Sequence, residues 1–435
     1  MFMLIFTGIN CKAREYNPIS DRFDPDDQPF AHILPAIKPV LGVGGQGFRA
    51  EDCAECHRAI YQEWQQSSHA AAMKDLQFHA ELAKKDSPRW LCLNCHAPVE
   101  NQRMFKVKGL KNNNVLSPVF ESNHKVDLSM RAEGVTCAVC HIRNQGEISV
   151  IIGPFGSRLA PHPVKKDRQS LNNICERCHN PRGEAVTNNL LCWFETYKEM
   201  AEYNRQSNQK YSCTTCHMPE TERRLVEDLK NLPLRKTRQH LWVGSGIPKA
   251  FKGYETLLER GYQPGLVARS RLKGSELLIF LENISGHYLP TADPERFLLL
   301  EVVLYTGNTK MRLLRERIGQ TWKWNPARKI ADNRLKVHEK RQFKTYAQDS
   351  YSKINVRIFH VRLRTEILSS IKASKEVDKS TVKEISKKLE SFEEHYPMAN
   401  LIYQKTFYKN GTSRELSLRE LVKLSKAQNS YDRPY

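Results

Sequence analysis

The chain has 435 residues, of which 40% are apolar and 9% aromatic, and it carries 68 Lys and Arg against 48 Asp and Glu, a formal net charge of +20. The length predicts two to three domains of roughly 150 residues each, and the apolar fraction excludes a disordered chain. No apolar run approaches the ~18 residues of a membrane-spanning helix, which excludes a membrane bundle, whereas the positive charge by itself allows nucleic acid, anionic lipid or acidic proteins as partners.

Residues 1–11 predict a leader or the remnant of a signal peptide. The stretch Met1–Phe6 is apolar, but it is short and lacks the basic residues with which a signal peptide opens. Removal of residues 1–10 would place Cys11 at the N-terminus, where a bacterial lipoprotein carries its lipid. Two hypotheses follow: a lipid anchor on Cys11, or an unpaired cysteine in a processed leader.

An extended arm is predicted over residues 12–48, because five prolines are followed there by four glycines. The next segment, 49–262, holds the motif C-x-x-C-H five times, with first cysteines 39, 45, 38 and 38 residues apart. Chance would give roughly 0.01 copies. The copies are motif 1 (Cys53, Cys56, His57), motif 2 (Cys92, Cys95, His96), motif 3 (Cys137, Cys140, His141), motif 4 (Cys175, Cys178, His179) and motif 5 (Cys213, Cys216, His217).

The spacing suits covalent haem attachment. Two thiols three positions apart can each add to one vinyl group of a haem, and the histidine that follows can ligate the iron. Zinc would need two cysteine pairs, or a cysteine pair and a histidine pair, for each metal. Zinc knuckles, thioredoxin-like redox pairs and a disulfide framework are the alternatives, and we predict five covalently attached haem c groups.

Haem also changes the charge balance and the expected compartment. Two propionates on each of five haems would bring the net charge from +20 to about +10, so no nucleic-acid partner is predicted. Cytochrome c maturation attaches haem outside the cytoplasm. We therefore expect a periplasmic or otherwise extracytoplasmic protein, with a membrane-anchored lipoprotein as the variant that Cys11 suggests.

Helices and strands follow different patterns along the chain. Residues 53–85 and 188–209 lack Pro and Gly and predict helices, and Cys192 in the second of them is expected to be a buried thiol. Beyond residue 265, β-branched and leucine-rich runs predict strands of an antiparallel sheet. The predicted strands are 276–284, 297–305 and 354–363; charged helices are predicted over 375–394 and 417–428, the latter opened by a Ser417-x-x-Glu420 capping box.

The predicted fold is a mainly α, haem-packed multihaem cytochrome domain with much irregular chain, followed by a small antiparallel, sandwich-like β domain with C-terminal helices. We expect the pentahaem domain over 49–262, the β domain over 263–370 and the charged helices over 371–435.

The sequence around motif 1, C-A-E-C-H-R-A-I-Y-Q-E-W-Q-Q-S-S-H-A, resembles the first haem segment of the multihaem cytochromes grouped with hydroxylamine oxidoreductase and the tetrahaem cytochrome of ammonia oxidisers. C-L-N-C-H-A-P, E-G-V-T-C-A-V-C-H and C-T-T-C-H-M-P resemble later haem segments. I-S-G-H-Y-L-P-T, residues 284–291, resembles a G-H-x-x-P-T turn that follows the haem region in some members. The resemblance covers residues 50–305 and is more specific for haem than for a reaction.

A second axial ligand is needed for each iron, and the histidines outside the motifs are the candidates. By the resemblance and by its position, His69 is the first; its twelve-residue distance from His57 spans about 18 Å along a helix, so it should ligate the haem of another motif. The resemblance also implies His162, His240 and His287. His124 and His79 compete for the fifth place, and His32 is a more distant candidate. The histidines His338, His360 and His395 belong to the later region, and Met218 lies too close to His217 to reach the far side of that iron.

Three functions are compatible with these patterns. Bis-histidine haems exchange electrons but bind no substrate, so the first hypothesis is an electron-transfer protein, with no catalytic residue assigned. The alternative is a multihaem oxidoreductase whose one open haem acts on nitrite, hydroxylamine or a sulfur oxyanion; the C-x-x-C-K motif of ammonia-forming nitrite reductases is absent. The third is a haem-bearing sensor or adhesion module. Whether the chain is an enzyme is left undecided, with electron transfer favoured.

A basic segment offers a partner surface. Residues 310–344 hold twelve Lys and Arg and three Asp and Glu, and could dock an acidic redox protein or steer an anion. The alternative is an ordinary solvated face.

Overall fold

The computed structural model describes residues 33–73, 78, 81–82, 87–180, 185–187, 190–191, 195–242, 264–323, 326–348, 350–362 and 399–427. Several expectations fall outside these residues: the leader, Cys11, Cys192, the candidate ligands His32 and His79, the boundary at 262 and the helix over 375–394. None of the helices in the described part of the chain combines the length and apolar character needed to cross a bilayer.

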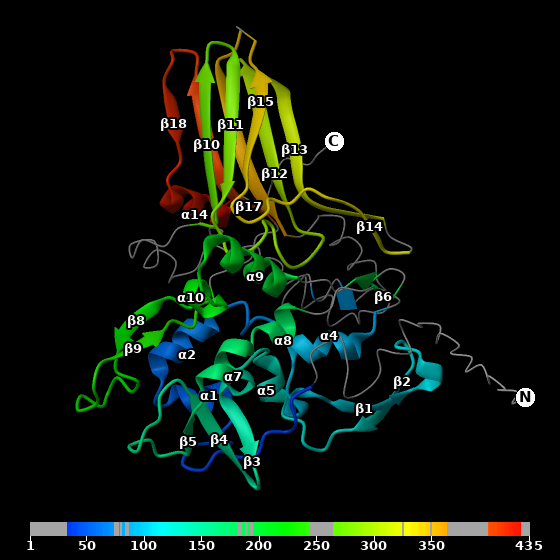
Figure 1. The fold of residues 1–435 in the computed structure, drawn as a ribbon, viewed down its shortest axis with the longest axis vertical. Coiled ribbons are helices and arrows are strands. Elements are labelled where there is room, and N and C mark those ends of the chain that lie inside the picture. Colours follow the sequence, from blue (N-terminus) through cyan, green and yellow to red (C-terminus); the bar gives the residue numbers. More distant parts are fainter. Residues whose placement is uncertain are drawn as a thin grey trace, which may run out of the picture.

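The C-terminal part is built from two antiparallel sheets (Figure 1). The smaller sheet has the order β10-β11-β15, and the larger has the order β14-β13-β12-β16-β17-β18. Their strands are β10 (Leu266–Lys273), β11 (Glu276–Asn283), β12 (Phe297–Thr306), β13 (Thr309–Lys323), β14 (Arg328–Asp332), β15 (Lys340–Tyr346), β16 (Lys353–Val361), β17 (Ala399–Tyr408) and β18 (Ser413–Glu415).

The core of this sandwich follows from the alternation of side chains along each strand. Leu277, Ile279 and Leu281 of β11 and Leu300 and Val302 of β12 belong to one buried cluster. The opposite face of the larger sheet packs against α14 (Leu418–Ala427), whose Leu421 is buried against it. This helix begins with the expected capping box, since the Ser417 N–H and hydroxyl donate to the Glu420 carboxylate at 2.8 and 2.9 Å.

The N-terminal part alternates short helices with small sheets. Its helices are α1 (Ala50–Ala54), α2 (Arg58–Gln65), α4 (Arg89–His96), α5 (Leu128–Ala132), α6 (Cys137–His141), α7 (Arg168–Asn173), α8 (Glu176–His179), α9 (Thr196–Ser207) and α10 (Cys213–His217). Its strands are β1 (Phe105–Leu110), β2 (Pro118–Ser122), β3 (Ile142–Gln145), β4 (Ile148–Gly153), β5 (Val164–Lys166), β6 (Ala185–Thr187), β7 (Leu190–Leu191), β8 (Glu220–Arg223) and β9 (Arg235–Arg238).

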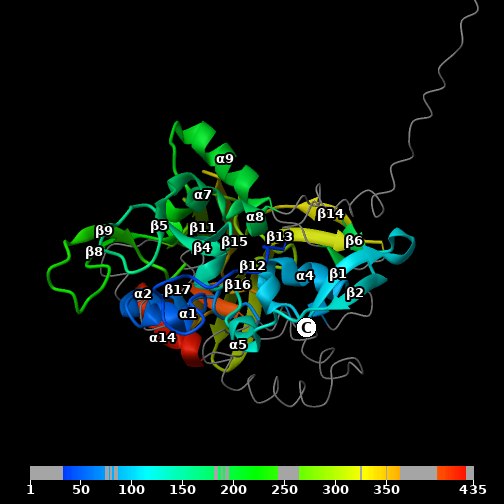
Figure 2. The same ribbon diagram turned by 90° about the horizontal axis from the view of Figure 1, so that it is seen from below.

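Helices in the motif-bearing part are shorter than the sequence suggested. The expected helix after Cys53 is interrupted between α1 and α2, because His57 takes the non-helical angles φ −104° and ψ 47°. The helix expected over 188–209 begins only at Thr196, and β7 occupies Leu190–Leu191. The sandwich stands on this part, with α9 at the junction between them; Figure 2 shows the same arrangement from below.

Candidate haem sites

Each attachment motif folds as one helical turn. Motif 2 lies in α4, motif 3 forms α6 and motif 5 forms α10. In motifs 1 and 4 the histidine N–H donates to the carbonyl of the first cysteine, His57 to Cys53 at 2.9 Å and His179 to Cys175 at 3.0 Å. Residues i, i+3 and i+4 of a helix share a face, so the turn presents two thiols and an imidazole to the same side. None of the ten motif cysteines forms a disulfide.

Thiols of different motifs lie against one another. Cys53 of motif 1 and Cys137 of motif 3 share a hydrogen bond that lowers the pKa of the first and raises that of the second. The same kind of contact joins motif 2 to motif 4 through Cys95 and Cys178, and motif 4 to motif 5 through Cys175 and Cys213. The charge of Cys178 also helps to raise the pKa of Cys140 of motif 3, after the larger effect of burial. The motifs therefore form a row, 1–3–4–5, with motif 2 beside motif 4.

Three motif histidines each face a histidine that is distant in sequence. The ring centres are 6.1 Å apart for His141 and His240, and 6.2 Å apart for His217 and His287. His179 faces His69 at 6.3 Å. Two imidazoles bound to opposite sides of one iron through bonds of about 2 Å would have ring centres about 6 Å apart. The separations match that requirement, so these pairs fit a haem iron.

The protonation of these rings also suits ligation. Burial lowers the pKa of His240 to about 3 and that of His179 to about 4, so both are neutral at neutral pH, as metal ligands must be. In five of the histidines Nδ1 lies 2.8–3.0 Å from a backbone carbonyl, which can only accept a hydrogen bond. Nδ1 therefore carries the proton and Nε2 is left for a metal. These five are His57, His96, His141, His240 and His287.

The two remaining motif histidines have different surroundings. His162 lies near His57, since burial and then the charge of His57 lower its pKa, and its Nδ1 is buried without a hydrogen-bond partner. His96 stacks on Phe78, with ring centres 3.9 Å apart. His124 is exposed in the loop after β2.

Trp242 lies between two of the histidine pairs. Its ring is 4.8 Å from that of His69 and 5.1 Å from that of His240, edge-on to both. Its backbone has φ +40°, a left-handed conformation that costs a bulky residue about 1–2 kcal/mol. The sequence analysis did not assign this residue, although it lies two positions after His240; its unusual backbone is not visible in a sequence.

Arginines beside the motifs suit the carboxylates that a haem would bring. Arg103 is 5% exposed and donates to the Trp90 carbonyl and the Asn94 side chain, while its Nε is buried without a partner. It pairs with no carboxylate among the described residues, and burial lowers its pKa to about 9. Near motifs 3 and 4, Arg143 and Arg177 line a cleft, and burial lowers the pKa of both.

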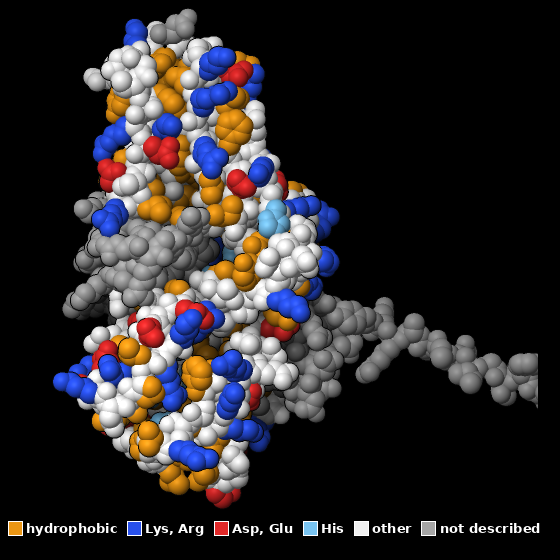
Figure 3. Space-filling model, turned by 60° about the vertical axis from the view of Figure 1, so that its left-hand side comes forward, with side chains coloured by type: hydrophobic (Ala, Val, Ile, Leu, Met, Phe, Trp, Pro, Cys, Tyr) orange, Lys and Arg blue, Asp and Glu red, His pale blue; other side chains and the backbone are white. Residues whose placement is uncertain are grey.

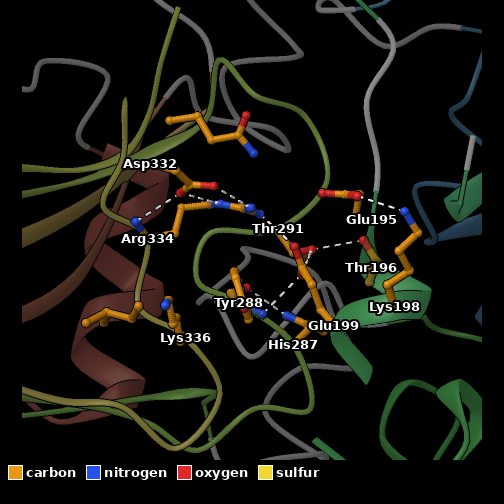
Figure 4. Close-up of polar contacts among 12 residues, drawn as sticks. Glu195, Thr196, Lys198, Glu199, His287, Tyr288, Thr291, Asp332, Arg334 and Lys336 are labelled. Carbon is orange, nitrogen blue, oxygen red and sulfur yellow. Dashed lines mark hydrogen bonds and ion pairs between the residues drawn. The ribbon is translucent and has the colours of Figure 1, made fainter. Parts of the chain in front are cut away.

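The loop that carries His287 is fixed by a polar network (Figure 4). Glu199 of α9 accepts hydrogen bonds from the Tyr288 N–H at 3.1 Å and from the Thr291 hydroxyl at 2.6 Å. It also pairs with Arg334 at 2.7 Å. The sequence analysis missed both residues, because Glu199 lies in a polar helix and Arg334 in the basic segment 310–344, where charged side chains are expected to be solvated.

The basic segment 310–344 is partly neutralised by neighbours. Its ion pairs include those of Arg315 with Glu301 and of Lys340 with Glu282. All five residues of β14 are exposed, Arg328 and Lys329 among them. Figure 3 shows Lys and Arg spread over both parts of the face it presents, with apolar side chains between them.

Comparisons with known proteins bear on this arrangement. Residues 52–142, which contain motifs 1 to 3, match the family Cytochrome c554 and c-prime. A solved structure, that of a penta-heme cytochrome c552 from Thermochromatium tepidum, is similar with a TM-score of 0.49 and 18% identity, over 74% of this chain and 93% of that one. A comparison with curated proteins gave no match. The family match supports a multihaem c-type cytochrome with covalently bound haem c and a role in electron transfer.

Proposed function

We propose that the chain is an extracytoplasmic cytochrome with five covalently attached haem c groups, which carries electrons through bis-histidine irons. The observation that carries the proposal is the three facing imidazole pairs, whose ring centres are 6.1–6.3 Å apart. When bound, each haem would supply an iron that gains and loses one electron. We also propose kinship with the hydroxylamine oxidoreductase group, on the residues that resemble it.

The proposed ligand sets follow from the pairs. His141 and His240 would hold the iron of motif 3, and His217 and His287 that of motif 5. His69 would hold the iron of motif 4 with His179, a crossing ligation, because His69 lies in the turn after α2 and follows motif 1 in the sequence. His162 is proposed as the partner of His57, supported by its buried Nδ1. For motif 2 the candidates remain His124 and His79.

The contacts between motif thiols support an order of transfer. Motifs 1, 3, 4 and 5 form the row, and motif 2 joins it beside motif 4. Electrons that cross the row from motif 1 to motif 5, or that pass between motif 2 and either end, would therefore pass through motif 4. Arg103, Arg143 and Arg177 are proposed to balance the charge of haem propionates.

The partners and location are proposed on chemical grounds. An acidic redox protein suits the basic segment 310–344, with the exposed Arg328 and Lys329 of β14 as its centre. A periplasmic location follows from haem attachment, and a lipid on Cys11 would tether the protein to a membrane.

The alternative function, which the resemblance also allows, is that of a multihaem oxidoreductase in which one haem has an open iron. Nitrite, hydroxylamine or a sulfur oxyanion could then bind the iron directly, and the other motifs would deliver or remove electrons.

Low-temperature EPR of the oxidised, haem-loaded protein tests both functions. Mass measurement first counts the haems, and we expect five. Optical titration with nitrite, hydroxylamine and carbon monoxide then detects an open iron. Five low-spin irons that ignore all three ligands would support the electron carrier, whereas a high-spin signal that shifts with nitrite or hydroxylamine would favour the enzyme. Fewer than five haems, or none, would overturn the proposed cofactor set.

A further inference from the structure

The sandwich carries a histidine that faces motif 5. Residues 284–296 connect β11 to β12, and from this loop His287, 7% exposed, faces the ring of His217. The loop is held on both sides. Asn283 of β11 donates its side-chain amide to the carbonyls of His287, Leu335 and Lys336, and Glu199 holds it from α9, which belongs to the motif-bearing part.

The contact from α9 is part of a buried network of charged side chains. Glu199 is 4% exposed and Arg334 is 7% exposed, and their atoms Oε1 and Nη1 are 2.7 Å apart. Arg334 continues to Asp332, whose carboxylate accepts from Nε at 2.9 Å and from Nη2 at 2.8 Å. The guanidinium also lies over the Tyr288 ring, 5.0 Å from its centre. Three charged groups of two chain segments thus meet beside the ligand loop.

Such a buried ionic network specifies one conformation but adds little to stability. A buried ion pair gains little over apolar packing, because desolvation offsets the attraction between the charges. Removing one partner is strongly unfavourable, because it leaves a buried charge unpaired. The ionic network therefore permits one position of the loop, in which the Tyr288 N–H donates to Glu199. That position also fixes His287, the residue immediately before Tyr288.

A second distal histidine is held in the same manner. Glu63 of α2 accepts a hydrogen bond from the backbone N–H of His240 at 2.9 Å and pairs with Arg223 at 2.9 Å. In both places a helix carboxylate, neutralised by an arginine, binds the backbone at or next to a histidine that faces a motif. The repetition ties the arrangement to the histidines rather than to general packing.

We propose that Glu199 and Arg334 are positioning residues. Their contact couples the placement of the sandwich loop to His287, the proposed second axial ligand of the iron at motif 5. With the contact intact, His287 faces His217 and the iron is closed. When the contact is broken, the loop withdraws His287 and the site accepts a small external ligand. This inference rests on the proposed haem at motif 5.

The experiment uses the full, haem-loaded chain and counts carbon monoxide bound to the reduced protein. His287→Ala is the reference, and we expect it to bind one more carbon monoxide per chain than the unchanged protein. Glu199→Ala is expected to match it, with one new high-spin EPR signal and a return to low spin when imidazole is added. The Glu199→Gln variant keeps one acceptor oxygen, so it should bind only a fraction of the additional carbon monoxide.

Glu301→Gln is the matched control, because Glu301 is also a buried carboxylate of the sandwich, paired with Arg315 and Arg357. It should leave the carbon monoxide count unchanged. If Glu199→Ala does not fold, Glu199→Gln and Arg334→Lys carry the test by the same count.

The outcomes separate the two levels of inference. No extra carbon monoxide with His287→Ala would overturn the proposed ligand, and with it the function proposed for motif 5. An extra molecule with His287→Ala but none with the folded Glu199 and Arg334 variants would overturn the coupling alone. Equal opening by Glu301→Gln would also overturn it, because general loosening of the sandwich would then be the cause.

Discussion

Crossing ligation by His69 leads to a sharp prediction. In the structure His69 faces His179 of motif 4 at 6.3 Å, although it lies only twelve residues after His57 of motif 1. His69→Ala should therefore open the iron of motif 4 and leave that of motif 1 unchanged. Because one pair serves one iron, the change should involve one of the five motifs, a fifth of the haem absorption, and one additional carbon monoxide per chain.

A second set of variants identifies which iron has opened. Cys175→Ser with Cys178→Ser removes the attachment site of motif 4, and Cys53→Ser with Cys56→Ser removes that of motif 1. His69→Ala should add no carbon monoxide in the first background and one molecule in the second. His338→Ala, at an exposed histidine that is not a proposed ligand, is the control and should add none in either. If the extra molecule disappears only when motif 1 is removed, His69 serves its own motif and the geometric argument is refuted.

Four further predictions test other parts of the structure. Trp242→Leu should alter the low-spin EPR signals of two irons, because the Trp242 ring contacts two distal histidines; changes at only one iron, or at every iron, would contradict this. Arg103→Met should lower the potential of one haem by about 60 mV, a tenfold shift of a one-electron equilibrium, since a buried positive charge favours the reduced state; an unchanged redox titration would contradict it. Leu300→Ala should cost about 2–5 kcal/mol in urea unfolding because Leu300 is fully buried, whereas Ile330→Ala, at 53% exposure, should stay within about 0.5 kcal/mol. Burial opposes ionisation of Asp332, but its arginine partner outweighs burial and lowers the pKa, so this carboxylate adds stability above about pH 4 that is lost as the pH falls through the folded-state pKa; Asp332→Asn should flatten the acid side of the Tm–pH profile, and an unchanged profile would count against the ion pair.

The sandwich strands could be located from the sequence because their signal is local. Side chains alternate between two faces along a strand, and the runs expected at 276–284, 297–305 and 354–363 are found as β11, β12 and β16. The motif-bearing part has a weaker periodic signal. Porphyrin faces would replace apolar side chains as its core, so helix lengths could not be inferred from apolar spacing.

The pairing of histidines depends on contacts that no local pattern contains. His240 lies 99 residues after His141, His287 lies 70 after His217, and His69 lies 110 before His179. Residue type and resemblance identified these histidines as candidates. Only the fold determines which motif each one faces, because the answer depends on how the motif helices pack.

The charged residues of the ligand loop were missed for a related reason. In a polar helix such as α9, Glu199 predicts a solvated side chain, and its burial is tolerated only because Arg334, 135 residues later, neutralises it. Neither residue is informative without the other. A sequence pattern can indicate a buried charge only when its partner is local, as with Ser417 and Glu420 at the start of α14.

The position of His287 changes the role expected of the β domain. An independent domain would satisfy its buried polar groups internally and would contact the motif-bearing part only through its surface. Instead the sandwich contributes an imidazole that faces His217, and α9 returns a buried carboxylate to the loop that carries it. Each part thus completes a contact that the other begins. Motif 5, at the end of the row, is therefore where a partner that docks on the sandwich could most directly affect electron transfer, and the sandwich is better understood as part of the haem-binding fold than as an appended domain.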